Sequence, residues 1–391
     1  MHVISDSAEL ARICAEFATA PYVTVDTEFL RERTYWSQLC LVQMARPGDE
    51  DAVLVDPLAD GIDLGPLYAL MADERVTKVF HAARQDVEIF AHGGDVIPRP
   101  LFDTQVAAMV CGYGEQVGYE TLVRKIAKAT IDKSSRFTDW SRRPLSEKQL
   151  VYAVADVTHL RDVYESLRDR LERTGRTGWV AEEMAVLTDP ATYAADPDEA
   201  WQRVKARSNS PKFLAVVRAL ARWREITAQS RDVPRSRVLK DDALLEIATA
   251  APKTAEELSG MRLLQREARK PEVAAEILAA VAEGLACPPA RMPRPAPPPR
   301  RREGSTAVAD LLKVFLKARA DEIGVASRLI APAAEIEALA GEEEIEDLPV
   351  LKGWRREVFG ADALRLRDGN TGLAAGPQGI RLVDVTEMAE G

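Results

Sequence analysis

The sequence predicts a mixed α/β domain over residues 1–190, followed by two small all-α domains at 200–283 and 305–370. Two features of the sequence support this fold class. Short apolar runs of strand length first follow one another closely and then alternate with helical segments, which is the pattern of a mixed sheet. Beyond residue 190 the apolar residues keep a helical spacing, interrupted by a proline-rich stretch at 284–304.

The stretch 22–29 is predicted to be a strand, because β-branched and aromatic residues dominate it. It follows a short amphipathic helix at 7–18, for which Ser7 is the predicted N-cap. Because side chains alternate along a strand, Asp26 and Glu28 share one face. Two carboxylates this close repel each other unless a cation or water neutralises them. The stretch is therefore either a cation-binding strand or an edge strand with a solvated polar face.

Two further apolar runs follow this strand closely. The runs 39–45 and 52–56 are separated by the turn signal Pro47-Gly48-Asp49. Together with the first strand they predict an antiparallel meander, and a short helix is expected at 66–71 after it.

Strands then alternate with helices. The run 76–80 is a compact apolar strand, and the predicted helix 84–92 carries Asp86 in its first turn. A short strand ends at Phe102, and Asp103 is predicted to N-cap the next helix. Taken alone, Asp86 is explained by its favourable interaction with the helix dipole.

A basic loop interrupts the helical pattern that extends from Tyr119 to about Arg173. Its cations lie beside Trp140 in the sequence, and they are Lys133, Arg136, Arg142 and Arg143. They suit either contacts with phosphates or a surface loop that the tryptophan anchors.

The long helix after this loop begins at Ser146, and Gln149 supplies part of a capping box. Tyr152 and Asp156 lie four residues apart in this helix and so share one face. Taken singly, they would be a half-buried aromatic residue and a solvated acid.

Positive charge is concentrated at the start of the second domain. Residues 201–240 contain eleven Lys or Arg residues and only two acids, Glu225 and Asp232. The chain as a whole has a formal net charge of −10, so it is not basic throughout. Residues 284–304 are predicted to be a semi-rigid linker, and residues 371–391 a mobile, glycine-rich tail.

Composition excludes several classes of protein. The four cysteines form no C-x-x-C pair, which favours free thiols in a reducing compartment. We see no signal peptide and no run of about 18 apolar residues. A Walker-type glycine-rich loop is missing, and the histidines lack the spacing of a zinc site. We expect a cytoplasmic monomer with no membrane span.

Four acids and one tyrosine are the candidates for chemistry, and they are Asp26, Glu28, Asp86, Asp156 and Tyr152. Hard cations such as Mg²⁺ prefer oxygen ligands, usually carboxylates with water and substrate phosphate. Two such ions about 4 Å apart can activate a water and stabilise the leaving oxygen of a phosphodiester. A nearby tyrosine hydroxyl can orient the attacking water.

These residues carry a resemblance to a known family. Asp-Thr-Glu-Phe at 26–29, the segment 81–90 with Asp86, and Tyr-Ala-Val-Ala-Asp at 152–156 resemble the three exonuclease motifs of the DEDDy superfamily. Segments around them, such as Phe-Asp-Thr-Gln at 102–105, resemble the bacterial ribonuclease D family. The likeness covers residues 1 to about 175.

The resemblance implies a ribonuclease H-like fold, two divalent ions (Mg²⁺ or Mn²⁺) and stepwise 3′→5′ removal of nucleoside 5′-monophosphates from RNA. It implies that Asp26, Glu28 and Asp156 hold the ion that carries the nucleophilic water. Asp26 would bridge to a second ion, which Asp86 would reach directly or through water. Tyr152 would orient the water.

Residues 201–283 resemble the HRDC domain, a helical nucleic-acid-binding module, and residues 305–370 would by analogy be a second, degenerate one. The candidate RNA-binding residues are Lys133, Arg136, Arg142, Arg143, Arg203, Lys205, Arg207 and Lys212. The implied substrates are tRNA precursors with single-stranded 3′ tails. Two alternatives stay open at this point: a 3′→5′ DNA exonuclease, and a catalytically silent RNA-binding protein.

Overall fold

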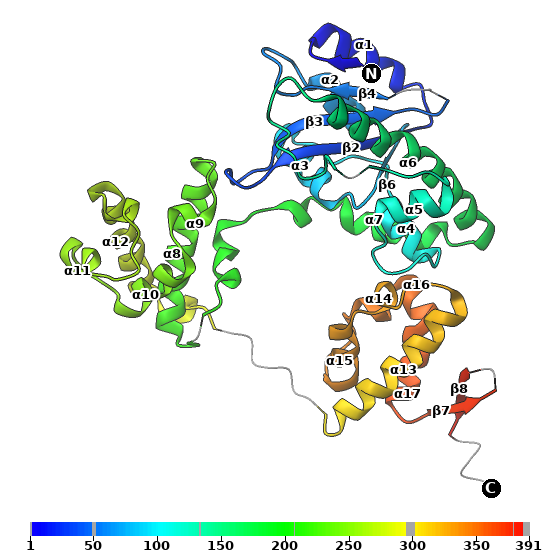
Figure 1. Cartoon of the computed structure of the whole chain (residues 1–391). Coiled ribbons are helices and arrows are strands. Elements are labelled where there is room, and N and C mark those ends of the chain that lie inside the picture. The colour runs from blue at the N-terminus through cyan, green and yellow to red at the C-terminus, as the bar shows by residue number, and fades with distance from the viewer. Residues whose placement is uncertain are drawn as a thin grey trace.

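The first domain is organised around a six-stranded sheet with the order β1-β4-β3-β2-β5-β6 (Figure 1). The computed structural model describes residues 2–48, 52–132, 134–206, 208–294, 302–377 and 379–385. The strands of the sheet are β1 (His2–Ile4), β2 (Tyr22–Leu30), β3 (Gln38–Ala45), β4 (Val53–Val55), β5 (Thr77–Phe80) and β6 (Leu101–Asp103). The pairs β2–β3 and β3–β4 are antiparallel, and the other pairs are parallel. The predicted meander and the mixed sheet are therefore confirmed.

Strand β2 lies in the interior of the sheet, between β3 and β5, so the edge-strand alternative is wrong. Val23 and Val25 are fully buried on the face that α1 (Ser7–Phe17), α2 (Gly65–Ala72) and α3 (Arg84–Gly94) cover. The opposite face is crossed by α6 (Glu147–Thr174).

Local capping explains where three helices of this domain begin. Asp103 accepts a hydrogen bond from the amide of Gln105 and so caps α4 (Thr104–Val110), as predicted. Ser146 and Gln149 form a complete capping box at the start of α6. At α1 the prediction was wrong by one residue, because Asp6 rather than Ser7 is the N-cap. The domain is completed by α5 (Tyr119–Ile126) and α7 (Thr177–Leu187).

The second domain is all-α and has a hydrophobic core of its own. Its helices are α8 (Pro211–Ser230), α9 (Arg235–Val238), α10 (Asp241–Ala250), α11 (Ala255–Ser259) and α12 (Pro271–Leu285). Leu220, Leu244 and Ile277 are fully buried at its centre. Separate burial of this kind is what an independent domain requires.

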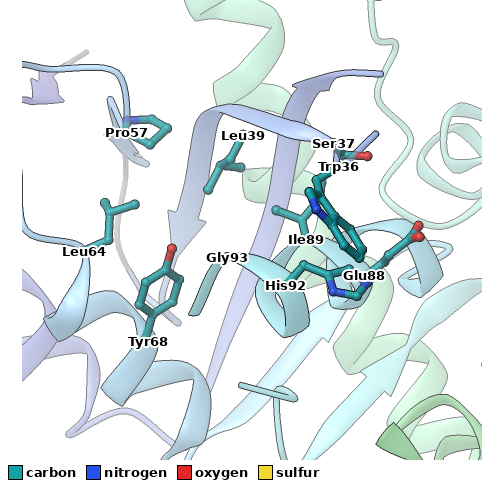
Figure 2. A pocket seen from close by; sticks show the side chains of 10 residues that line it. All are labelled: Trp36, Ser37, Leu39, Pro57, Leu64, Tyr68, Glu88, Ile89, His92 and Gly93. Atoms are coloured by element: carbon teal, nitrogen blue, oxygen red, sulfur yellow. The ribbon is translucent and has the colours of Figure 1, made fainter. Parts of the chain in front are cut away.

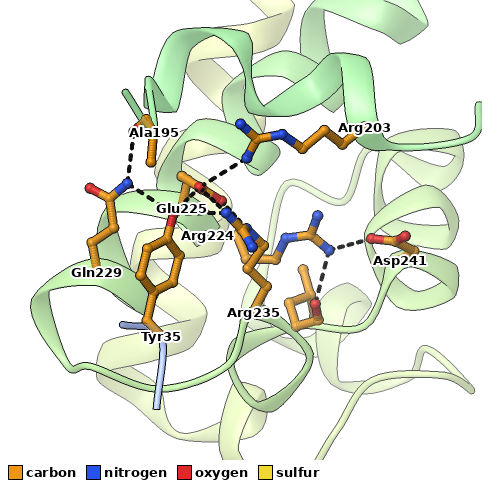
Figure 3. Close-up of polar contacts among 9 residues, drawn as sticks. Tyr35, Ala195, Arg203, Arg224, Glu225, Gln229, Arg235 and Asp241 are labelled. Atoms are coloured by element: carbon orange, nitrogen blue, oxygen red, sulfur yellow. Dashed lines mark hydrogen bonds and ion pairs between the residues drawn. The ribbon is translucent and has the colours of Figure 1, made fainter. Parts of the chain in front are cut away.

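The second domain is attached to the first through the loop that follows β2 (Figure 3). The Oδ1 atom of Asp232 accepts hydrogen bonds from the backbone amides of Tyr35 and Trp36, both at 3.0 Å. The Tyr35 hydroxyl donates to Glu225, whose side chain is buried. The second domain therefore contacts the loop that follows β2, the strand that carries Asp26 and Glu28.

The third domain is also helical, as predicted, and it packs against the first (Figure 1). Its helices are α13 (Ser305–Ile323), α14 (Ser327–Ile330), α15 (Ala333–Gly341), α16 (Gly353–Arg355) and α17 (Ala361–Arg367). The ring of Trp354 stacks on that of Trp179 at 4.7 Å, and Arg355 forms an ion pair with Glu183 at 2.7 Å. One continuous cluster of buried apolar side chains includes residues of both domains.

The prediction of a mobile tail over 371–391 needs correction. Its described part forms an antiparallel hairpin of β7 (Thr371–Gly376) and β8 (Gly379–Asp384). The hairpin packs against α13 and α17, which supplies the burial that a two-stranded ribbon lacks by itself. Residues 378 and 386–391 lie outside the described part of the chain.

The predicted linker at 284–304 begins within the last turn of α12, and residues 295–301 fall outside the described part. Over the residues that the structure does describe, none of the helices has the length and apolar character needed to cross a membrane.

Candidate active site

Three of the predicted carboxylates come together where α6 crosses β2. Asp26, Glu28 and Asp156 each offer one oxygen atom, and these atoms all lie within 4.8 Å of one another. Strand alternation places Asp26 and Glu28 on the face that α6 covers. The buried Thr24 hydroxyl donates to the carbonyl of Val157 at 2.8 Å, which fixes α6 against β2 beside Asp156. The cluster is therefore built into the packing of a strand and a helix that are far apart in sequence.

Asp86 lies in the same cleft but outside this group of three. It is in the first turn of α3, it is 6% exposed, and it accepts a hydrogen bond from the Thr27 hydroxyl at 2.5 Å. Thr27 stands between Asp26 and Glu28 in the sequence, so this hydrogen bond ties the start of α3 to the strand of the other acids.

The carboxylates are held in an environment that disfavours their negative charge. Burial, followed by the charge of Asp156, raises the pKa of Asp26 well above its usual range. Burial and the charges of Asp26, Asp156 and Asp86 raise the pKa of Glu28 to about 10. Burial raises the pKa of Asp156 to about 7, against the opposing effects of Tyr152 and Arg136. A bound cation would reverse these shifts, because it stabilises the ionised form.

Tyr152 lies one turn before Asp156 on α6 and lines the cleft. Burial, followed by the charges of Asp156, Glu28 and Asp26, raises the pKa of its hydroxyl. The hydroxyl therefore stays protonated and keeps a hydrogen to donate beside the carboxylates.

The cleft has a volume of about 530 Å³, and it contains groups that the sequence reasoning missed. Tyr119 lines it from α5 and donates a hydrogen bond to the carbonyl of Ala155 at 3.0 Å. His81 lines it from the end of β5, with Nδ1 3.0 Å from the Thr104 hydroxyl. Burial lowers the pKa of His81, so the ring is neutral. Both positions depend on contacts between distant segments, which the spacing of motifs does not encode.

The basic loop divides into residues that face the cleft and residues that hold the loop. Arg136 lines the cleft, and Arg142 is largely exposed and pairs with Asp139 at 3.3 Å. Arg143 instead forms two hydrogen bonds of 2.6 Å with Asp56 and donates to three backbone carbonyls. Its guanidinium is therefore engaged within the protein, and the assignment of Arg143 to RNA binding stays a prediction that these contacts do not favour. Lys133 lies outside the described residues.

The cations predicted in the second domain also differ in their surroundings. Arg203 is 3.3 Å from the buried carboxylate of Glu225 and is partly neutralised there. Lys205 and Lys212 line an open groove of about 1500 Å³, together with Arg203. Arg207 lies outside the described residues. The groove therefore offers two lysines for which the structure gives no ion pair among the residues it describes.

A further hollow of about 440 Å³ lies beside α3, and Trp36 and His92 form one wall of it with ring centroids 4.0 Å apart (Figure 2). Its other side is lined by Tyr68, Leu39 and Leu64. Among the described residues that line it, Glu88 is the one carboxylate, so this part of the chain gives the hollow no acid pair like that of the catalytic cleft.

The fold and the carboxylate cleft together define a 3′→5′ exonuclease that carries a helical nucleic-acid-binding domain. The 3′-5′ exonuclease family matches residues 1–172, and the HRDC domain matches residues 213–281. The chain belongs to the ribonuclease D family, and it is a hydrolytic exoribonuclease. Ribonuclease D from Jannaschia sp. is 57% identical over 386 residues, which cover 98% of this chain and all of that one.

Other relatives agree with this assignment. Ribonuclease D from Nitrobacter hamburgensis is 52% identical, over 96% of this chain and 97% of its own length. The crystal structure of Escherichia coli RNase D, described as an exoribonuclease involved in structured RNA processing, superposes with a TM-score of 0.81. It is 28% identical and covers 94% of this chain and 98% of its own. The likeness therefore extends over all three domains.

Proposed function

We propose that this exoribonuclease hydrolyses RNA from a free 3′ end with two divalent cations, Mg²⁺ or Mn²⁺, held by Asp26, Glu28, Asp86 and Asp156. The observation that carries the proposal is the group of three carboxylate oxygens within 4.8 Å of one another. A donor set made only of carboxylates suits hard cations that keep waters and substrate phosphates as further ligands. Such ions supply an activated water and stabilisation of the leaving oxygen.

Each residue has a separate task in this proposal. Asp26 is assigned to both cations, because it belongs to the group of three and its charge, after burial, also raises the pKa of Asp86. Asp86, outside the group of three, is assigned to the second cation directly or through water. The protonated Tyr152 hydroxyl orients the attacking water, since its raised pKa keeps the hydrogen on the oxygen. The released products are nucleoside 5′-monophosphates.

The substrates that we propose are structured RNAs with short unpaired 3′ tails, in particular tRNA precursors in the cytoplasm. The cleft of about 530 Å³ has room for nucleotides but not for a double helix. The second domain, and a second HRDC-like domain at 305–370, would hold the folded body by its phosphates. All four acids come from one chain, so a monomer is sufficient for the activity.

The deciding experiment uses the purified full chain with a tailed hairpin RNA and a matched DNA oligomer. We expect 3′→5′ trimming of the RNA tail with Mg²⁺ or Mn²⁺ and complete loss of trimming with EDTA. Equal rates on RNA and DNA would favour the general exonuclease instead. Binding of the RNA without cleavage, in any of these metals, would favour a silent RNA-binding protein.

A further inference from the structure

One aromatic side chain at the catalytic cleft is turned toward solvent. Phe137 is 91% exposed, the highest value among the large apolar residues that the structure describes, and it lines the same cleft as the carboxylates. A single exposed apolar residue is ordinary on a protein surface. Phe137, however, lies at the cleft, on a fixed loop and beside the charged side chain of Arg136, and this position requires an explanation.

The loop on either side of Phe137 is fastened to the domain. Trp140 is 2% exposed and packs with Cys40 and Leu54. Thr138 donates its hydroxyl to the carbonyl of Ser135 at 2.7 Å and accepts from the side chain of Gln149 at 3.1 Å. The double hydrogen bond between Arg143 and Asp56 holds the far end of the loop. The phenyl ring is therefore held outward by a rigid base, which keeps the entropy cost of binding through it low.

The neighbour of Phe137 points to the class of ligand. The guanidinium of Arg136 lies over the phenyl ring, 5.2 Å from its centroid. The positive charge of Arg136 also acts to lower the pKa of Glu28 and Asp156, against the stronger effect of burial, so the pair stands close to the carboxylates. A cation and an exposed aromatic face next to one another match the alternation of phosphate and base along an unpaired strand.

We propose that Phe137 stacks on a base of the unpaired 3′ tail while Arg136 holds an adjoining phosphate. This inference rests on the proposed function and deepens it, because it names the part of the protein that selects unpaired RNA. Every base has a face that can stack, so the contact tolerates any sequence. A base within a helix has both faces covered by its neighbours and cannot reach the ring without unstacking. Phe137 is thus a specificity-determining residue that makes the enzyme stop near a stem.

The test compares Phe137→Ala, Phe137→Leu and Phe137→Trp in the full chain with the wild-type enzyme. The control is Val186→Ala, which removes another exposed apolar side chain, one that is 62% exposed and does not line the cleft. We expect Phe137→Ala and Phe137→Leu to lower kcat/KM on an unpaired RNA about 10-fold to 100-fold, mainly through KM. Phe137→Trp should keep most of the activity, and the control all of it.

An abasic substitution moved along the tail separates stacking from a general effect of the loop. In the wild-type enzyme an abasic nucleotide at one position should lower kcat/KM by about the same factor as Phe137→Ala does on the intact tail. The Phe137→Ala enzyme should then have the same kcat/KM whether or not that nucleotide carries a base. If Phe137→Ala lowers kcat/KM relative to the wild type by the same factor on the abasic tail as on the intact tail, the stacking proposal is wrong. The proposed function fails separately, if the wild-type enzyme with metal does not trim the intact tail at all.

Discussion

The Tyr35 hydroxyl donates a hydrogen bond to the buried carboxylate of Glu225, and this bond joins the loop after the catalytic strand to the second domain (Figure 3). Arg235 donates to both oxygens of the same carboxylate at 2.5 Å, and its guanidinium lies 4.6 Å from the centre of the Tyr35 ring. Burial acts to raise the pKa of Glu225, but the hydrogen bonds from Arg235 and Tyr35 outweigh it, and the pKa is lowered. Glu225 is therefore ionised and depends on these partners.

Tyr35→Phe tests whether this contact positions the second domain. Loss of one hydrogen bond to a charged group costs about 1.5 to 3 kcal/mol, which is enough to loosen a small interface. We expect kcat/KM to fall several-fold on a tailed hairpin and to stay unchanged on a short unpaired oligomer, with more frequent protease cleavage near residues 195–210. Glu276→Gln, which removes the charge of the carboxylate that accepts from Trp223 within the second domain, is the control. Equal losses on both substrates would contradict a positioning role.

Asp26→Asn should abolish cleavage and leave RNA binding nearly intact. The substitution keeps the size of the side chain and removes the charge assigned to both cations, so several kcal/mol of transition-state stabilisation are lost. Most phosphate contacts come from Lys and Arg residues elsewhere. Single-turnover assays and filter binding measure the two effects, and residual activity within tenfold of the wild type would contradict the assignment.

Tyr152→Phe should slow the chemical step by roughly 100-fold, the range typical of a group that orients or moves a proton. The ring still packs beside Trp140, so folding and metal affinity should be preserved. Tyr164→Phe, on the same helix but outside the cleft, is the matched control. An unchanged single-turnover rate would return Tyr152 to a purely structural role.

The metal-free protein should lose stability as the pH rises through neutrality. The pKa of Asp156 in the folded chain is about 7, against an ordinary value of 3.8. The folded state therefore keeps a proton that the unfolded chain releases, and the stability linked to it is complete below about pH 4 and is lost as the pH rises through about 7. Asp156→Asn should remove the part of this loss that Asp156 causes, while the part caused by Asp26 and Glu28, whose pKa values are also raised, remains.

Thermal melts in EDTA between pH 5 and pH 8.5 measure this linkage. We expect Asp156→Asn to raise the Tm relative to the wild type at pH 8.5 and to raise it less at pH 5. We also expect Mg²⁺ to raise the wild-type Tm at pH 8.5. Asp321→Asn is a control, because that side chain is 72% exposed. A wild-type Tm that rises with pH in EDTA would show that folding does not raise the pKa values of these carboxyl groups.

Lys205 and Lys212 should contribute to the salt dependence of RNA binding. Each phosphate contact that is lost should reduce the slope of log K against log[salt] by about 0.7 to 0.9. We expect the double change Lys205→Gln and Lys212→Gln to make the slope shallower by about 1.5 on a tRNA-like substrate. Arg222→Gln, whose side chain pairs with Asp198 at 2.7 Å, should change the slope less. An unchanged slope in the double variant would mean that RNA binds elsewhere.

Most of the first domain could be predicted because its elements are marked by local signals. Asp103 and Ser146 cap the helices that they were expected to cap, and strand lengths followed the apolar runs. Strand β1 was missed because it has three residues and gains its strand character only by pairing with β4. The hairpin of β7 and β8 was missed because its glycines are typical of mobile tails, while its order comes from packing on α13 and α17.

The candidate active site was likewise predicted only in part from the sequence. Motif spacing pointed to Asp26, Glu28 and Asp156, because strand and helix periodicity fix which residues share a face. It could not show that Arg143 is bound to Asp56, since those residues are brought together only by the packing of the loop on the sheet. Charge counts over 201–240 likewise ignored the ion pairs that neutralise part of this segment.

The stacking of Trp179 on Trp354 has a consequence for the order in which the domains fold during synthesis. Protein synthesis proceeds from the amino terminus, and domains fold as they emerge. The nuclease domain shares its buried cluster with helices that emerge after the linker, whereas the second domain holds all of its own core. On the ribosome, the second domain can therefore finish folding before the domain that precedes it. The apolar surface around Trp179 stays uncovered until translation is nearly over, and a chain released early would present that surface to chaperones and proteases.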